Sequence, residues 1–409
     1  MWYTIFYTDQ KGINMKKRDR LLYILTVIFA ALYIFVCNRI ATADKKEYTL
    51  NYDVGTPQKV QVTQVIDPNY KDVVYEGFET DDRIILFEAK FLKGYRKGET
   101  FNAIQSIDSM YAIDQRVVQP GDKVIVYLNQ NPAVTDVKYM FAEYHRVDFI
   151  ILLYVLFCLL LLLLGKKNGI NTLVSLVFTV ASVFFVFIPA VLNGGNIYSW
   201  SISVCIYIII MTLLIISGFS KKSIAAIIGC SSGVCMAGIL TVLSTKICHL
   251  TGLTTEDAMY LLFLNSENPI DLKAVTFAAI ILGAVGAIMD VSMSLSSSLA
   301  ELKEQVGNMS AKQITRSGMV IGRDIMGTMA NTLILAYIGS SLSVTLLLAA
   351  YNSTQPLLLF NTEMILVELL QAVAGSLGIL LTIPLTSIIC GFLYTDENDS
   401  KKKYVKEEI

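Results

Sequence analysis

Apolar residues gather along the chain into runs of membrane-spanning length, which short polar segments separate. A helix needs about 20 mostly apolar residues to cross the hydrocarbon layer, so this pattern predicts a membrane α-helical bundle of about eight transmembrane helices. The first two runs are shorter, and flanking aromatic and neutral residues extend them far enough to cross. The predicted spans are residues 21–37, 149–164, 170–192, 200–217, 223–247, 274–293, 325–350 and 364–393.

Basic residues indicate how these helices are oriented. They cluster at residues 16–20, 166–167, 221–222, 303–323 and 401–403. The positive-inside rule places such clusters in the cytoplasm, and all of them fall on that side when the N-terminus is cytoplasmic. We therefore expect a multi-pass protein of the cell membrane, with residues 1–20 and the charged tail 394–409 both in the cytoplasm.

The first apolar run has two interpretations. The basic residues before it, the run itself and Ala41-Thr42-Ala43 after it form the pattern of a cleaved secretory signal. An uncleaved signal anchor is favoured, because the run is longer than the ~7 to 15 residues usual in a signal. Residues 1–14 resemble an upstream extension, so Met15 is a more ordinary start than Met1. Under both interpretations residues 44–148 lie outside the cytoplasm.

Residues 44–148 are the one predicted soluble domain. β-rich segments such as KVQVTQVI, RIILFEAKFL and KVIVYLN alternate with turn signals such as VGTP and QPGD. Five or six short strands at this spacing predict an extracytoplasmic all-β domain, a small OB-like barrel. Barrels of this kind often bind oligomers, but the segment has no basic groove with interleaved aromatic residues, which favours a spacer or docking domain.

Composition narrows the functions that the chain can have. It is 54% hydrophobic and 16% charged, and its net charge of -1 creates no field that would attract nucleic acid. The seven cysteines form no CxxC pair and the two histidines are far apart, so no disulfide framework, zinc site or cofactor is indicated. HExxH and GxSxG motifs are absent, and the stretch from Gly322 to Thr328 lacks the lysine of a phosphate-binding loop. We therefore expect no enzyme.

Three of the predicted helices carry small and polar residues three or four positions apart, which places them on one face of each helix. The most polar members are Asp290 in the sixth span, Asp324 and Asn331 in the seventh, and Glu368 and Gln371 in the eighth. The three stripes are Gly283, Gly286, Asp290, Ser294, Ser297 and Glu301; Asp324, Thr328, Asn331, Leu335 and Ile338, with Gly327 beside them; and Glu368, Gln371, Gly375, Gly378 and Thr382.

The carboxylates of these stripes lie at different predicted depths. Asp290 is ~25 Å along the helix axis from Lys273, which places it near the cytoplasmic edge of the hydrocarbon layer. Glu368 lies some ~10 Å below the outer surface and is the deepest carboxylate. Arg323 begins the seventh span at a depth close to that of Asp290, so the two are able to pair. Such a pair would reduce the roughly 2.5 to 3.5 kcal/mol that a charge costs at a helix centre.

Each of these features also has a purely structural interpretation. Stripes of small residues let membrane helices approach closely, and packing is the favoured role of the glycines. Ionisable residues inside the membrane indicate function by default, although an interhelical structural pair stays an alternative for Asp290 and Glu368. Arg323 is equally well explained as a positive-inside anchor. The glycines in question are Gly283, Gly286, Gly318, Gly322, Gly327, Gly375 and Gly378.

The same residues carry a resemblance to a known family. The stretches GAVGAIMDVSMSLSSSLAELKE and RSGMVIGRDIMGTMANTLILAYIGSSL closely resemble the YibE/F-like family of bacterial multi-pass membrane proteins. The resemblance extends over roughly residues 120–395 and is most specific from 283 to 342. It implies an extracytoplasmic β-rich segment between the first two spans and a permease-like protein without an assigned substrate. It implies no catalytic role for any residue.

Our leading hypothesis is a permease in which the last three helices enclose a polar path for an ion, a proton or a small solute. Asp290 and Glu368 would bind a cation or relay protons, and Asn331 and Gln371 would be neutral ligands. The rival hypothesis is a non-transporting scaffold or sensor in the lipid bilayer. In it, residues 44–148 bind an envelope protein and the polar stripes only hold the bundle together.

Overall fold

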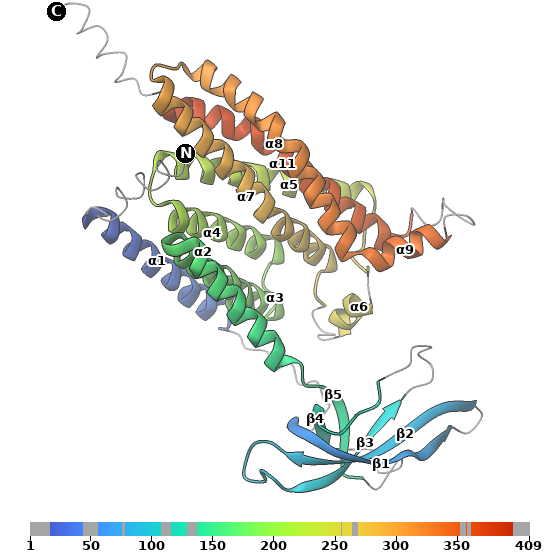
Figure 1. Cartoon of the computed structure of the whole chain (residues 1–409). Coiled ribbons are helices and arrows are strands. Elements are labelled where there is room, and N and C mark those ends of the chain that lie inside the picture. Colours follow the sequence, from blue (N-terminus) through green and yellow to red (C-terminus); the bar gives the residue numbers. More distant parts are fainter. Residues whose placement is uncertain are drawn as a thin grey trace, which may run out of the picture. The chain divides into compact units, whose positions relative to one another are not determined.

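The computed structural model describes residues 17–43, 56–75, 78–107, 116–128, 137–254, 256–263, 269–351, 357 and 361–395 (Figure 1). The start of the chain, Met15 included, and the charged tail from residue 396 lie outside the described residues. The chain divides into two compact units. One comprises residues 49–160, and the other comprises residues 1–48 together with 161–409.

The smaller unit contains a closed five-stranded barrel. Its strands are β1 (Gln58–Tyr75), β2 (Phe78–Phe91), β3 (Thr100–Ile107), β4 (Lys123–Leu128) and β5 (Tyr139–Tyr144). They pair in the order β1-β2-β3-β5-β4, and β1 closes the barrel by pairing with β4. All pairs are antiparallel except β3 with β5. Alternate residues such as Val124 and Val126 are fully buried in its core, as the period-two pattern predicts. The expected all-β barrel is therefore present.

A buried glutamine holds the segment before β4 against the barrel. Gln105 is 3% exposed, its Nε2 donates to the Arg116 carbonyl at 3.0 Å, and its Oε1 accepts from the Val118 amide at 3.0 Å. Val118 is itself fully buried, so its amide has no access to water. The sequence pattern did not reveal this contact, because a glutamine within a strand is more often exposed.

Replacing Gln105 with leucine is expected to destabilise the barrel by about 1 to 3 kcal/mol, because the Val118 amide stays buried without an acceptor. Amide hydrogen exchange on the full-length protein checks this, since the amides of β3 and β4 should be less protected in the variant than in the wild-type protein. Gln64→Leu is the matched control, since Gln64 is exposed and should change stability by at most ~0.5 kcal/mol. Equal protection in the two variants would show that Gln105 does not hold this segment.

Ion pairs connect the barrel to the helix that follows it. Asp148 at the start of α2 (Val147–Ser182) lies 2.9 Å from Nζ of Lys59 and 3.3 Å from Nζ of Lys123. The two lysines belong to β1 and β4, which are neighbours in the barrel. Each pair is at least partly exposed, so the contact orients the first turn of α2 more than it stabilises the unit.

Six helical segments of the described residues are long and apolar enough to cross a membrane. They are Arg20–Ala41, Val147–Leu192, Ile197–Ser217, Lys221–Ile247, Leu272–Val306 and Glu363–Tyr394. The apolar residues 149–164 are almost all exposed. Exposed apolar helices of this length are stable in lipid and not in water, so the chain is a membrane protein.

Two predicted spans share the segment Val147–Leu192. Its backbone leaves helical geometry at Lys166, with φ 48° and ψ -122°. A Cβ on Gly169 would collide with the carbonyl oxygen of Leu161, so glycine lets the chain after the break lie directly against the chain before it. The segment continues through a π-helical turn, η2 (Val183–Phe187), into α3 (Ile188–Leu192).

The predicted seventh span is divided between two helices. α8 (Ala311–Ser340) begins much earlier than residue 325, at a capping box made by Ser310 and Gln313. It ends at Ser340 with Ser341 as its C-cap, and the shorter α9 (Leu342–Tyr351) continues in a different direction (Figure 1). The residues at the junction, Gly339 to Ser341, favour helix weakly, and this explains a break that hydropathy did not reveal.

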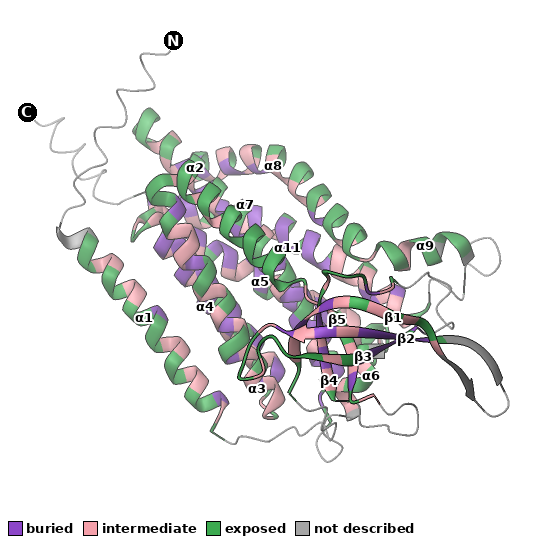
Figure 2. Ribbon diagram, turned by 60° about the horizontal axis from the view of Figure 1, so that its bottom comes forward, coloured by how far each residue is buried: buried purple, intermediate pink, exposed green. Residues whose placement is uncertain are grey.

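The core of the larger unit lies among α4 (Ile197–Ser217), α5 (Lys221–Ile247), α7 (Leu272–Val306) and α11 (Glu363–Tyr394). α11 contacts α5, α7 and α8, while α1 (Lys17–Ala41) contacts α4. The rings of Tyr33 and Tyr207 stack at 4.2 Å in the contact between α1 and α4. Figure 2 shows buried residues on α4, α5, α7 and α11, whereas α1 and α2 are largely exposed. A short helix, α6 (Glu256–Phe263), precedes α7.

Candidate functional site

The polar residues of α11 lie on its buried side, at the junction with α7 and α8. Glu368 and Gln371 are half-buried, and Gly375, Gly378 and Thr382 are buried along the same face. This stripe therefore points into the protein. Its acidic end lies where α8 passes into α9.

Ser341, at the junction between α8 and α9, donates a hydrogen bond from Oγ to Oε2 of Glu368. The break after α8 places this hydroxyl against α11. None of the ion pairs among the described residues includes Glu368. Glu368 is therefore a half-buried carboxylate with a neutral hydrogen-bond donor, in a setting where a charge is expensive without a cation.

Tyr337 of α8 completes this polar cluster. Its hydroxyl oxygen is buried and lies near Gln371 and Glu368, but it makes no full hydrogen bond among the described residues. Gly283 of α7 faces the same hydroxyl, since a Cβ built on Gly283 would come within 2.8 Å of it and within 3.6 Å of Gln371 Nε2. A larger residue at position 283 would fill this space. We name Glu368, Gln371, Ser341 and Tyr337 the junction cluster.

Sequence reasoning missed Tyr337 and Ser341, although both belong to a stretch that it singled out. Neither is on the Asp324 to Ile338 stripe. A tyrosine near a helix end is also typical of the membrane interface, so Tyr337 gave no signal of a functional role. Only the direction of α8 relative to α11 brings the two hydroxyls to Glu368.

The α7 stripe lies mostly outside the buried core. Gly283, Gly286, Asp290 and Ser294 are exposed in the isolated chain, whereas Ile288 and Val291 on other sides of the helix are fully buried. A Cβ on Gly286 would meet nothing within 4 Å. Asp290 is seven residues beyond Gly283, so it lies about 10 Å along α7 from the junction cluster.

The α8 candidates are also exposed. Arg323, Asp324 and Asn331 are all on the surface of the isolated chain, and Gly327 has no heavy atom within 4 Å of a built Cβ. The feasible pair between Arg323 and Asp290 is not among the ion pairs of the described residues. Geometry thus groups Glu368 with Gln371 and leaves Asp290, Arg323, Asp324 and Asn331 outside the cluster.

The other four glycines that were predicted to serve packing lie where helices contact each other. On α8, Gly318 lies against Ser387 of α11, and Gly322 lies against Ile383. On α11, a Cβ on Gly375 would be 2.9 Å from Leu333 Cδ2, and one on Gly378 would be 2.9 Å from Ile288 Cδ1.

A second buried polar contact joins α7 and α11. The hydroxyls of Ser292 and Thr386 are 2.9 Å apart and both residues are fully buried. Gly229 of α5 lies directly against this pair. The contact satisfies both hydroxyls without a charge, so it serves helix association.

No group of three or more metal-ligating His, Cys, Asp or Glu side chains occurs among the described residues. The junction cluster supplies one carboxylate, one amide and two hydroxyls. These groups suit a proton or a hard cation held by oxygen atoms, with further oxygen ligands from water.

The family model for YibE/F-like protein matches residues 153–396, which include α7, α8 and α11. The chain belongs to the YibE/F-like family. The resemblance inferred from the sequence is thereby confirmed, and the matched region contains the whole junction cluster and Asp290. The barrel strands, which end at Tyr144, precede the matched residues. No curated protein and no solved structure matches the chain.

Proposed function

We propose that this YibE/F-like protein is a permease that moves a proton, another cation or a small solute along α7, α8 and α11. The observation that supports it best is the setting of Glu368, a carboxylate half-buried between helices with a hydroxyl donor and no described cation beside it. A carboxylate in this setting lowers its energy by taking up a proton or a cation, which is the elementary step of transport.

The exposed side of α7 extends this proposal into a path. Gly283 borders the junction cluster, Gly286 leaves open space beside the helix, and Asp290 follows on the same face. Asp290 is about 10 Å along α7 from Gly283, with small residues between these two positions. A cargo that reaches Glu368 would next meet Asp290. Arg323, Asp324 and Asn331 would border the path from the neighbouring helix.

The proposal includes the orientation that the basic residues favour. Both termini would be in the cytoplasm of the cell, and the barrel would be on the opposite side of the membrane. Glu368 would then be the outer acidic group and Asp290 the inner one.

Flux measurements on proteoliposomes test the proposal. Vesicles that contain the purified protein should take up protons or a cation faster than protein-free vesicles, as reported by pH-sensitive and cation-sensitive dyes. The Asp290→Asn variant should slow this flux severalfold, because it removes a charge from the path and keeps the side-chain size. Equal rates for the wild-type protein and protein-free vesicles with every ion tested would contradict the proposal.

A scaffold or sensor is the second candidate, favoured by the barrel being a compact unit of its own outside the family match. In that case an envelope protein would bind the barrel. Deleting residues 44–148 would then abolish the cellular phenotype, while the Asp290→Asn and Glu368→Gln variants would behave as wild type. If the protein is a permease, the Asp290→Asn and Glu368→Gln variants should lose the cellular phenotype, and deleting residues 44–148 should not abolish it.

A further inference from the structure

Two adjoining cavities lie between α4, α5 and α7, away from the junction cluster. Their volumes are about 540 Å³ and about 390 Å³. Tyr198, Val242, Lys246 and Phe277 line both of them, so the two spaces meet at these residues. Together they form one elongated site with an apolar part and a polar end.

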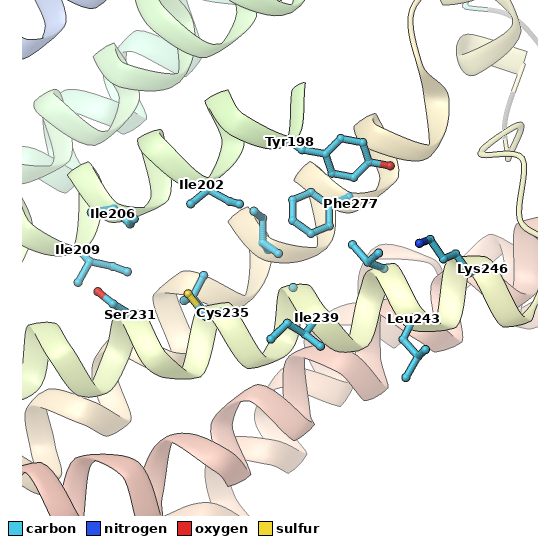
Figure 3. A pocket seen from close by; sticks show the side chains of 14 residues that line it. Tyr198, Ile202, Ile206, Ile209, Ser231, Cys235, Ile239, Leu243, Lys246 and Phe277 are labelled. Carbon is cyan, nitrogen blue, oxygen red and sulfur yellow. The ribbon is translucent and has the colours of Figure 1, made fainter. Parts of the chain in front are cut away.

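The larger cavity is an apolar groove that opens to the side of the helical unit. Isoleucines 202 and 206 of α4 form one wall, and Ile239 and Leu243 of α5 form the other (Figure 3). Ile202, Ile239 and Leu243 are all exposed, so the groove faces the region that lipid occupies. Along α5 it extends from Ser231 to Lys246, about 22 Å, which exceeds the ~15 Å depth of one leaflet.

The smaller cavity brings three basic side chains to one end of this groove. Lys246, His249 and Lys273 line it, and all three are exposed. None of them belongs to an ion pair among the described residues. No acidic side chain lines this cavity. Two acids close to it bind backbone amides: Asp271 accepts from Lys273 and Ala274 at the start of α7, and Glu363 accepts from Thr251 and Gly252. The charge at this end of the groove is therefore positive.

His249 is held at this end by an unusual backbone. It has φ 53° two residues after the end of α5, in the left-handed region where glycine normally terminates a helix. Leu250 N donates to Thr245 O at 3.1 Å, and Leu250 is buried, which completes the terminating turn. A histidine in this region is strained relative to glycine, because its Cβ crowds the backbone. Its imidazole adds a hydrogen-bond donor beside the two lysines.

We propose that this site binds an anionic membrane lipid. One acyl chain lies in the groove between α4 and α5, and the lipid phosphate lies against Lys246, His249 and Lys273. Charge complementarity selects the occupant, because two ammonium groups favour a net negative headgroup over a zwitterionic one. A soluble phosphate would satisfy the basic end but would leave the apolar groove without a ligand.

Photo-crosslinking in nanodiscs tests this with two probes that share a diazirine-bearing acyl chain. One has a phosphatidylglycerol headgroup and the other a phosphatidylcholine headgroup. In the wild-type protein, the phosphatidylglycerol probe should label peptides that contain residues 231–246 at least tenfold more than the phosphatidylcholine probe does.

Variants then separate the two parts of the site. Lys246→Gln with Lys273→Gln should remove the headgroup preference, and the double arginine variant should restore it. Lys303→Gln with Lys312→Gln is the matched control at another surface and should leave labelling unchanged. Cys235→Trp, which fills the groove, should reduce labelling by both probes. Melting temperatures confirm that each variant is folded.

Three results would overturn the proposal. The first is equal labelling by both probes in the wild-type protein. The second is a headgroup preference that survives the double glutamine substitution. The third is saturable binding of inorganic phosphate that depends on Lys246 and Lys273 while neither lipid probe labels the groove, which would assign the basic end to a soluble anion.

Discussion

Replacing Gly233 with leucine is expected to destabilise the helical unit by about 3 kcal/mol or more and to lower its melting temperature in detergent by roughly 10 °C. Gly233 lies on α5 where α7 and α11 both touch it. A built Cβ would collide with Oγ1 of Thr382 and would be 3.1 Å from Cγ2 of Ile288. Thr382 and Ile288 are fully buried, so neither side chain has space to move away.

Gly286→Leu provides the matched control for this substitution. Gly286 is also inside a long membrane helix, but nothing lies within 4 Å of its built Cβ. Leucine favours helix over glycine by almost 1 kcal/mol, so this variant should melt at the wild-type temperature or slightly above it. Thermal unfolding followed by circular dichroism compares the two. Indistinguishable melting temperatures would mean that α5, α7 and α11 do not meet at Gly233.

Under the proposed permease function, Glu368→Gln is expected to lower transport at least tenfold while leaving the protein folded. Glutamine keeps the size of the side chain and an oxygen that accepts from Ser341, so the contact between α8 and α11 persists. It is unable to take up a proton or to carry the negative charge that attracts a cation. A tenfold loss corresponds to about 1.4 kcal/mol in the rate-limiting barrier.

The control for Glu368→Gln is the same chemical change at an exposed site. Glu301 on α7 is exposed and accepts a hydrogen bond only from Gln305, at 2.8 Å, among the described residues. Glu301→Gln should transport at the wild-type rate. Dye-reported flux in proteoliposomes of matched protein content measures both variants. A Glu368→Gln variant that transports normally would remove Glu368 from the path and leave its bond to Ser341 as a structural contact.

Much of the local structure could be predicted because it depends on short stretches of sequence. The helix in Leu272–Val306 follows from its apolar run, and the barrel follows from strands with alternating apolar residues. The break at Ser341 could not be predicted from hydropathy, since α9 is as apolar as a membrane helix. It depends on small residues at the junction and on the contact of Ser341 with Glu368.

The candidate site was predicted in part. Glu368 and Gln371 lie together at the junction with α7 and α8, whereas Asp290, Asn331 and Asp324 are exposed on α7 and α8. Helical spacing tells which residues share a face of a helix, but it does not tell which neighbour that face meets. The stripes of α7 and α11 look alike in sequence, and only the packing of α11 against three other helices buries one of them.

By itself, then, the sequence determined the membrane class of the chain, its β-rich soluble domain and its family, because each depends on composition and on short-range pattern. The tertiary structure alone decided that Tyr337 and Ser341 meet Glu368, that Gly233 is enclosed by α7 and α11, and that Lys246 and Lys273 end one groove. These contacts join residues far apart in the chain. Their geometry depends on how whole helices cross, which no local pattern specifies.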